Sequence, residues 1–394
     1  MIGFDEAIAL LAEAAQPEGR DRVPLAAAHR RVLATPVVAG LDAPTTDTSA
    51  MDGYAVREAE FSLPARLKVI GESFAGRGCG GTVGPGECVR IFTGAPMPAG
   101  ADRVIIQEVV RRDGDLAIFD HALGGGRHVR TQGSDFRRGD TLLSPGRRLD
   151  PRAMVAAAAA DVAEVDVWTR PKVIVLGTGD ELAEPGQAAS RAGTVPESVS
   201  FGVAGMALDR GAHVLDRLRL PDQPAVLEQA AADALDRADI VVVTGGASVG
   251  EKDYARAMFG PSGLELIFSK VAIKPGKPVW LGRARGRLVL GLPGNPTSAM
   301  VTARLFLAPL LAAAAGEGAT AALAWRSAPL AGALPPCDGR ETFHRGVQGP
   351  DGITPVDNQD SSAQKALAAA DILIRRRPGS PAAAAGDTVE ILDF

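Results

Sequence analysis

One stretch constrains the fold of this chain more than any other: a β-branched run at residues 240–243 that stops at Thr244 in a glycine-rich turn. Such a run is typical of a buried parallel strand, and the backbone N–H groups just beyond its carboxyl end lie where α/β sheets bind ligands. We expect substrate contacts from Thr244, Gly245, Gly246 and Ser248. The alternative is an ordinary strand-to-helix turn, and this loop alone does not decide between the two.

Two further strands are predicted to end in similar loops. Residues 173–176 lead into Gly-Thr-Gly-Asp-Glu at 177–181, and residues 288–290 lead into Gly-Leu-Pro-Gly-Asn-Pro at 291–296. Helices are expected at about 200–210 and 225–237. A parallel sheet would gather all three loops at one edge, so the sequence predicts a site there.

Composition limits the partners. The chain has 394 residues, which is too long for one hydrophobic core, so several domains are expected. A net charge of −5 argues against a nucleic-acid binder. The most apolar stretch, 300–315, contains Arg304 and Pro309 and is short for a bilayer, so we interpret it as a buried helix and expect no membrane contact.

Cysteine usage and the N-terminus bear on the compartment. The three cysteines are scattered and lack CxxC spacing, which favours neither a disulfide framework nor a zinc site. Asp5 and Glu6 stand where a signal peptide would carry basic residues. The expectation is therefore a reducing cytoplasm.

Changes in composition divide the chain into four parts. We predict a discontinuous, elongated domain from 1–41 and 137–170, a small β-rich domain at 42–136, an α/β domain at 171–317 and a C-terminal β domain at 318–394. Residues 1–41 are expected to be mostly helical, with a second apolar pattern through Val32 and Leu33. Asp150 and Pro151 begin a helix through the alanines at 156–160.

Charged side chains gather around the predicted sheet edge. The acidic candidates Asp180, Glu181, Asp222 and Asp253 could hold Mg²⁺, which bridges a few carboxylates to substrate phosphates. Lys270 and Lys274 could bind an anion, because Pro275 stiffens their loop. Solvated turn residues are the alternative for each of these side chains. Further charged candidates are Asp52, Arg130, Asp135 and Arg345.

Six motifs in order make the interpretation specific. They are SAMDGYAV at 49–56, TGAP at 93–96, GTGDEL at 177–182, TGGASVG at 244–250, AIKPGKP at 272–278 and GLPGNP at 291–296. Together they resemble the MoeA family of molybdopterin molybdenumtransferases, which includes the E domain of gephyrin. The resemblance implies a doubly wound, three-layer α/β domain of the molybdopterin-binding type, an elongated dimerisation domain and a small β-barrel-like C-terminal domain.

The resemblance also implies an activity. Family enzymes insert molybdate into adenylylated molybdopterin, releasing AMP and molybdenum cofactor with the help of Mg²⁺. They act as homodimers whose sites are shared between subunits, and a transient contact with the preceding adenylyltransferase would fit. Implied catalytic residues are Asp52, Asp253, Lys270 and Lys274; implied substrate contacts are Thr93, Arg130, Asp135, Pro293, Pro296, Arg345 and Ser361; implied metal ligands are Glu181, Asp222 and Asp253.

The chain departs from the family pattern at four places, and two other functions compete. Val199 stands where asparagine usually follows an acidic-hydroxyl pair, and Thr48, Ser134 and Asp360 replace common asparagine, glutamate and glycine. The rival enzyme is the preceding adenylyltransferase, but it would account for 171–317 alone. A receptor-anchoring scaffold, as in gephyrin, is the alternative outside enzymes, since fold alone never fixes function.

Overall fold

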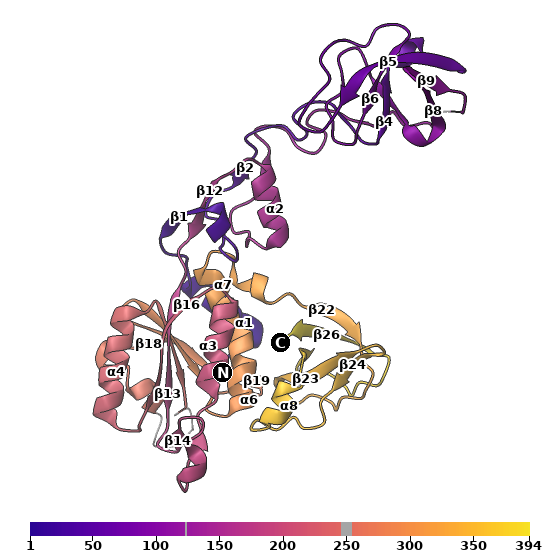
Figure 1. Ribbon diagram of the computed structural model, residues 1–394. Coiled ribbons are helices and arrows are strands. Elements are labelled where there is room, and N and C mark those ends of the chain that lie inside the picture. Colours follow the sequence, from indigo (N-terminus) through magenta and orange to yellow (C-terminus); the bar gives the residue numbers. More distant parts are fainter. Residues whose placement is uncertain (123, 246–253) are drawn as a thin grey trace.

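The computed structural model describes residues 1–122, 124–245 and 254–394. The described chain is elongated, with a β-rich region at one end, a small middle unit, and an α/β region beside a C-terminal β region at the other end (Figure 1). Gly246 and Ser248, predicted to contact substrate, and Asp253, predicted as a catalytic residue and metal ligand, lie outside the described residues.

The α/β region is built on a six-stranded sheet in the order β16-β13-β17-β21-β20-β18. Its strands are β13 (Lys172–Thr178), β16 (His213–Leu220), β17 (Ile240–Thr244), β18 (Glu265–Ser269), β20 (Trp280–Ala284) and β21 (Arg287–Leu292). The strands β16, β13, β17 and β21 pair in parallel, whereas β20 pairs antiparallel with β21 and with β18. The three strands predicted from β-branched runs therefore lie side by side, with their carboxyl ends at one edge.

Helices cover both faces of this sheet, because alternate side chains of each strand point to opposite faces. Val173 and Val175 join one apolar cluster, and Ile174 and Leu176 join another. The first face is covered by α1 (Phe4–Ala14), α3 (Val199–Asp209), α6 (Pro296–Thr302), a π-helical turn (Ala303–Leu307) and α7 (Ala308–Ala314). The second face is covered by α4 (Pro224–Arg237) and α5 (Tyr254–Ala257). The doubly wound, three-layer arrangement is thus confirmed (Figure 1).

The apolar stretch predicted as a buried helix is a central part of the core. Helix 296–314 is long and apolar enough to cross a membrane, but 89% of its most apolar window is buried inside the molecule. Leu305, Phe306 and Leu310 have no exposed surface and pack among the strand and helix side chains of the first face. Its hydrophobicity is therefore explained by packing within the fold.

Helix α1 belongs to the same core, which differs from the grouping of 1–41 into one elongated domain. Phe4, Ala7 and Leu11 are buried and pack with the α/β cluster, at the helical spacing that predicted the helix. The Phe4 ring meets Phe306 and Phe343 edge-on at 5.7 and 5.1 Å between centroids. The N-terminal helix thus joins the α/β and C-terminal regions.

The middle unit joins two distant segments. Strand β1 (Arg20–Pro24) pairs antiparallel with β12 (Glu164–Trp168), and β2 (Val37–Val38) pairs with β11 (Thr141–Leu143). Helix α2 (Pro151–Ala159) begins as predicted, with the Asp150 carboxylate accepting from Ala153 N at 2.8 Å. The helix predicted through Val32 and Leu33 is wrong: Val32 bridges Arg148, and Leu33 bridges Val167.

The β-rich region contains a six-stranded sheet in the order β7-β4-β6-β5-β9-β8. These strands are β4 (Gly53–Val56), β5 (Ala65–Ser73), β6 (Glu87–Ile91), β7 (Arg103–Ile106), β8 (Val110–Asp113) and β9 (Leu116–Phe119). A separate antiparallel pair joins β3 (Thr48–Ser49) to β10 (Val129–Arg130). The short strands and 3-10 helices not yet named, in this region and in the others, are β14 (Leu182–Ala183), β15 (Val195–Pro196), η1 (Leu25–Ala27), η2 (Glu58–Glu60), η3 (Gln107–Val109), η4 (Ala188–Ser190), η5 (Gly260–Ser262) and η7 (Ala319–Ala322).

The C-terminal region curls into a barrel-like sheet. Its elements are β22 (Arg326–Pro329), β23 (Glu341–Gly349), β24 (Gly352–Pro355), α8 (Gln364–Ala368), β25 (Ile372–Arg376) and β26 (Thr388–Asp393). A bridge from Leu330 to Ile353 brings the end of β22 back to β24. Strand β19 (Ile273–Lys274) leaves the α/β region and pairs in parallel with β23, so the two regions share a sheet.

Candidate functional site

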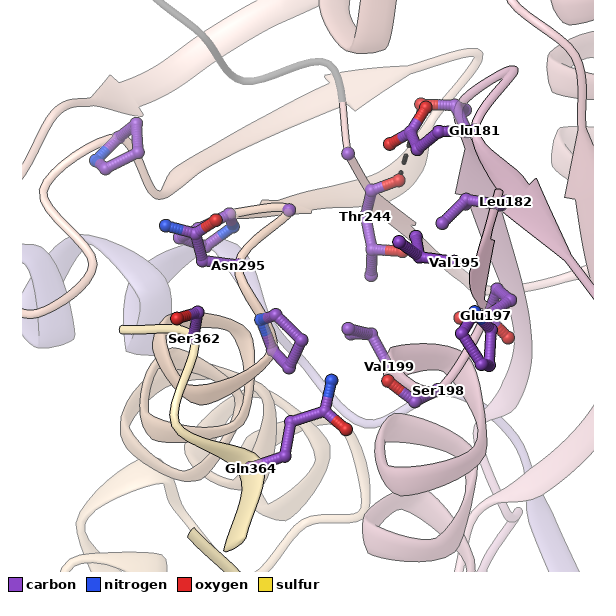
Figure 2. Close-up of a pocket in the computed structure, with 17 residues that line it drawn as sticks. Glu181, Leu182, Val195, Glu197, Ser198, Val199, Thr244, Asn295, Ser362 and Gln364 are labelled. Atoms are coloured by element: carbon purple, nitrogen blue, oxygen red, sulfur yellow. Dashed lines mark hydrogen bonds between the residues drawn. The ribbon is translucent and has the colours of Figure 1, made fainter. Parts of the chain in front are cut away.

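A cavity of about 690 Å³ opens at the carboxyl edge of the α/β sheet (Figure 2). Thr178 and Thr244 line it from the ends of β13 and β17, and the loop after β21 lines it with residues 293–296. Ser362, in the loop before α8, and Gln364, the first residue of that helix, close another side. The three strand ends that the sequence predicted to meet therefore do form one recess, and the C-terminal region completes its wall.

Glycines allow the loops to approach each other at the base of this cavity. Gly245 has φ +97°, and a Cβ there would lie 2.3 Å from Thr178 O. A Cβ on Gly294 would lie 3.3 Å from the Gly245 Cα. Any larger residue at position 245 would be strained and would clash, so glycine is required there by both its backbone and its neighbours.

A buried carboxylate fixes the helix that forms the opposite wall. Glu197 is 2% exposed; it accepts from Ser200 N at 2.8 Å and from Ser200 Oγ at 2.5 Å. The Arg217 guanidinium donates to the same carboxylate at 3.2 Å and stacks on Phe201, 3.5 Å from its centroid. Carboxylate bonds to the first turn stabilise a helix N-terminus, so this cluster holds the start of α3 against the cavity.

Two of the acidic residues predicted as metal ligands, Glu181 and Asp222, follow the neighbouring strands β13 and β16. Glu181 lines the cavity, and no hydrogen bond or ion pair to its carboxylate occurs among the described residues. Asp222 N donates to the Asp180 carboxylate at 3.0 Å, which ties the loop after β16 to the loop after β13. In residues 1–122, 124–245 and 254–394 no cluster of three His, Cys, Asp or Glu could hold a metal.

The donor set is nevertheless of the kind that suits Mg²⁺. This ion binds through one or two carboxylates and leaves its other positions to water and substrate phosphates. Glu181 offers an open carboxylate on the cavity wall, and Asp222 lies at the next strand end. Asp253, the third predicted ligand, lies outside the described residues.

Two of the residues carried over from the family position the C-terminal wall. The Asn295 amide donates to Ser361 Oγ at 2.9 Å, and Thr297 N donates to Ser361 O at 3.0 Å, so Ser361 docks on the start of α6. Arg345 is 1% exposed and donates to Asn358 O at 3.0 Å and to Asp360 O at 3.2 Å. Arg345 therefore holds the 358–363 loop in place and lines neither of the two large cavities near that loop.

The lysines predicted to bind an anion do not meet the acids in the first cavity. Lys274 lines a second cavity of about 880 Å³ between β19 and the C-terminal region, together with Lys277, Arg340 and His344. Burial first, and then the charges of Arg376, Lys274 and Arg345, lower the pKa of His344 to about 4. Lys270 is exposed and lines neither cavity.

This separation follows from strand pairing. Strand β19 carries Lys274 into the C-terminal sheet, where it faces Thr342 of β23. Pro278 lines both cavities, so the two recesses are neighbours. The second cavity, which carries the lysines, can thus hold an anion next to the first cavity, which Glu181 and Glu197 line.

The residues predicted from the β-rich region line neither cavity, and Asp52 with Thr93 forms what we call the Asp52 surface. The Asp52 carboxylate accepts from Thr93 N at 2.7 Å and from Thr93 Oγ1 at 2.8 Å, and these bonds lower its pKa. Arg130 and Asp135 are exposed; Arg130 lies opposite Thr48, and Asp135 N donates to Ala43 O. In Figure 1 this region lies at the opposite end of the molecule from the sheet edge.

The departures from the family pattern have identifiable environments. Val199 is 8% exposed and begins α3 on the wall of the first cavity, where it presents an apolar side chain (Figure 2). Asp360 lines the second cavity, and hydrogen bonds from Ser362 Oγ and N lower its pKa. Ser134 is exposed, and Thr48 pairs with Arg130.

Three cavity residues escaped the sequence analysis. Glu197, Gln364 and His344 stand in stretches without glycine loops or repeated acids. The acidic-hydroxyl pair Glu197-Ser198 entered the sequence analysis only because Val199 follows it. That pair is the one local signal that could have drawn attention to Glu197. Its partner Arg217 lies on β16, and that contact depends on tertiary packing.

The fold and this recess define a multidomain protein organised around a molybdopterin-binding type of α/β domain. The model of a probable molybdopterin binding domain matches residues 174–313, the MoeA N-terminal region (domain I and II) matches 2–160, and the MoeA C-terminal region (domain IV) matches 327–394. Curated molybdopterin molybdenumtransferases also align with nearly the whole length of this chain. The chain belongs to the MoeA family, the molybdopterin molybdenumtransferases.

Two curated relatives and one solved structure illustrate the match. The chain is 34% identical to a molybdopterin molybdenumtransferase of Haemophilus influenzae, over 100% of this chain and 99% of that protein. It is 36% identical to one of Synechococcus elongatus, over 97% and 96%. The crystal structure of a molybdopterin biosynthesis MoeA protein from Pyrococcus horikoshii superimposes with a TM-score of 0.86 at 26% identity, covering 100% of both chains.

Proposed function

We propose that this chain is a molybdopterin molybdenumtransferase that inserts molybdate into adenylylated molybdopterin, releasing AMP and molybdenum cofactor. The observation that carries the proposal is the family match along the entire chain, at 34% identity to a curated enzyme of that name. The rival adenylyltransferase would leave the N-terminal and C-terminal matches unexplained.

The two neighbouring cavities suit the chemistry. Molybdate, the dithiolate and the two phosphate groups are all anionic, so their approach requires positive charge nearby. Lys274, Lys277 and Arg340 supply positive charge in the second cavity, which Asp357 and Asp360 also line. Orientation and electrostatic stabilisation carry the reaction, and no nucleophilic side chain is needed.

The proposal includes Mg²⁺, a cytoplasmic location and a homodimer. Glu181 and Asp222 would hold the ion, together with Asp253, and when bound it offsets the charge of the substrate phosphates. A dimer is supported by the separation of the β-rich region, where Asp52 precedes β4, from the α/β region (Figure 1), because a second copy could bring one protomer's β-rich region to the other's sheet edge. A transient contact with the preceding adenylyltransferase would deliver the substrate.

An AMP-release assay with purified protein tests this function. We expect AMP only when adenylylated molybdopterin and molybdate are both present, and less AMP after Mg²⁺ is chelated. Consumption of ATP with free molybdopterin, and no AMP from the adenylylated form, would instead identify the adenylyltransferase. A Glu228→Ala variant, on the exposed surface of α4, should behave like the wild type.

A further inference from the structure

An aromatic stack with one exposed ring, that of Phe74, adjoins in sequence the residue that holds Asp52 in the β-rich region. The rings of Phe74 and Phe92 are stacked, with centroids 4.6 Å apart and planes 11° apart. The Arg90 guanidinium lies 4.8 Å from the Phe92 centroid and 5.1 Å from that of Tyr54. Phe92 immediately precedes Thr93, which holds the Asp52 carboxylate.

The stack is not explained by the core of its own domain. The two apolar clusters of that domain contain Tyr54, Ile91 and Phe119 but neither Phe74 nor Phe92. Phe74 keeps 43% of its surface exposed, even though it packs on Phe92. A large aromatic side chain left in water at a fixed orientation commonly marks a binding surface.

Hydrogen bonds hold this surface rigid. Arg90 donates to Gly53 O at 3.0 Å and to the Gln107 side chain, while Gln107 N donates to Asp52 O at 3.0 Å. Phe92 N donates to Ser73 O at 3.1 Å, which ties the two stacked residues through the backbone. The flat ring, the guanidinium and the carboxylate are therefore fixed relative to one another.

We infer that Phe74 and Phe92 form a stacking platform for a planar heteroaromatic ring of the substrate, with Asp52 accepting from the N–H groups at the ring's edge. This inference rests on the proposed function, whose substrate contains two such rings, an adenine and a pterin. Both present a π-face and exocyclic amino donors, which is the chemistry that an aromatic platform beside a carboxylate recognises.

Steady-state kinetics of AMP release test the platform. Phe74→Leu, which keeps an apolar side chain but removes the ring, should raise KM for adenylylated molybdopterin about tenfold, in line with the usual strength of base–aromatic stacking. KM for molybdate should not change. Phe74→Trp, which keeps a ring, should retain the wild-type KM, and Leu116→Ala, an exposed apolar residue of the same domain, should have no effect.

Equilibrium binding decides which ring is held and separates this inference from the proposed function. AMP probes the adenine, and molybdopterin without the adenylyl group probes the pterin; Phe74→Leu should weaken one of them about tenfold. These measurements need no turnover, so they test the platform even if the wild type releases no AMP. Unchanged Kd values for both probes would overturn the inference, as would a loss of dimer in Phe74→Leu with KM unaltered.

Discussion

The cavity at the α/β sheet edge and the Asp52 surface of the β-rich region differ in how they are built. The cavity is enclosed by segments from two regions and is held by buried charges, Glu197 at 2% and Arg345 at 1% exposure. The Asp52 surface is open, and its carboxylate is held by the exposed residue Thr93. The walls of the cavity are therefore held by buried bonds, whereas the Asp52 surface depends on contacts between exposed residues, and this difference leads us to expect different effects of mutation in the two places.

The largest effect should come from the open carboxylate in the cavity. Glu181→Ala should lower kcat of AMP release about a hundredfold, because it removes an electrostatic contact on which the reaction depends. Glu181→Ala keeps the backbone bond from Val195 N to Glu181 O, and the Glu181 carboxylate makes no hydrogen bond or ion pair among the described residues. The fold should therefore not change, and circular dichroism should confirm this.

The matched control is Glu228→Ala, which removes the same side chain from the surface of α4. If Glu181→Ala kept the activity of this control, Glu181 would not belong to the site.

A structural carboxylate of the same cavity should behave in the opposite way. Glu197→Ala removes the carboxylate partner of Arg217, which keeps its bond to Ser200 Oγ, and leaves Ser200 N without a cap, so α3 should lose about 2 kcal/mol of local stability. Hydrogen exchange should report this as faster exchange of α3 amides, with those of the β-rich region unchanged. Equal protection in Glu197→Ala and in the exposed variant Glu265→Ala would contradict the supporting role.

Lowering the pH should destabilise the folded protein through His344, which lines the second cavity. The pKa of His344 is about 4 in the folded chain, below its ordinary value of 6.5, because of burial and nearby cations. The stabilisation from neutral His344 is fully present above about pH 6.5 and is lost as the pH falls towards 4, by up to about 3 kcal/mol.

Melting temperatures measured between pH 4 and 7 check this. The wild type should lose more stability on acidification than His344→Gln does, while His213→Gln, at an exposed position, should follow the wild type. Parallel curves for wild type and His344→Gln would contradict the assignment.

The sequence predicted the elements with strong local signals. The β-branched runs at 240–243 and 173–176 became adjacent parallel strands, and Gly245 adopts the positive φ that its turn requires. Asp150 caps α2 because both cap and helix are local in sequence.

Long-range pairing could not be predicted in the same way. Val32 and Leu33 match a helical period, but pairing with residues 148 and 167 overrides that preference. Lys274 lies in a separate cavity because β19 pairs with β23, far along the chain. Glu197 caps the nearby Ser200, but its burial against Arg217 of β16 depends on tertiary packing, which no local sequence pattern predicts.

A complementation experiment tests most directly whether the sheet-edge cavity and the Asp52 surface work together across two subunits. Asp52→Ala and Glu181→Ala should each be nearly inactive as homodimers. In a mixed dimer one site carries both defects and the other is intact, and random pairing makes about half of the dimers mixed. Mixed and re-assorted subunits should therefore recover roughly a quarter of the wild-type rate of AMP release. Complete inactivity, with subunit exchange demonstrated, would contradict a site shared between subunits.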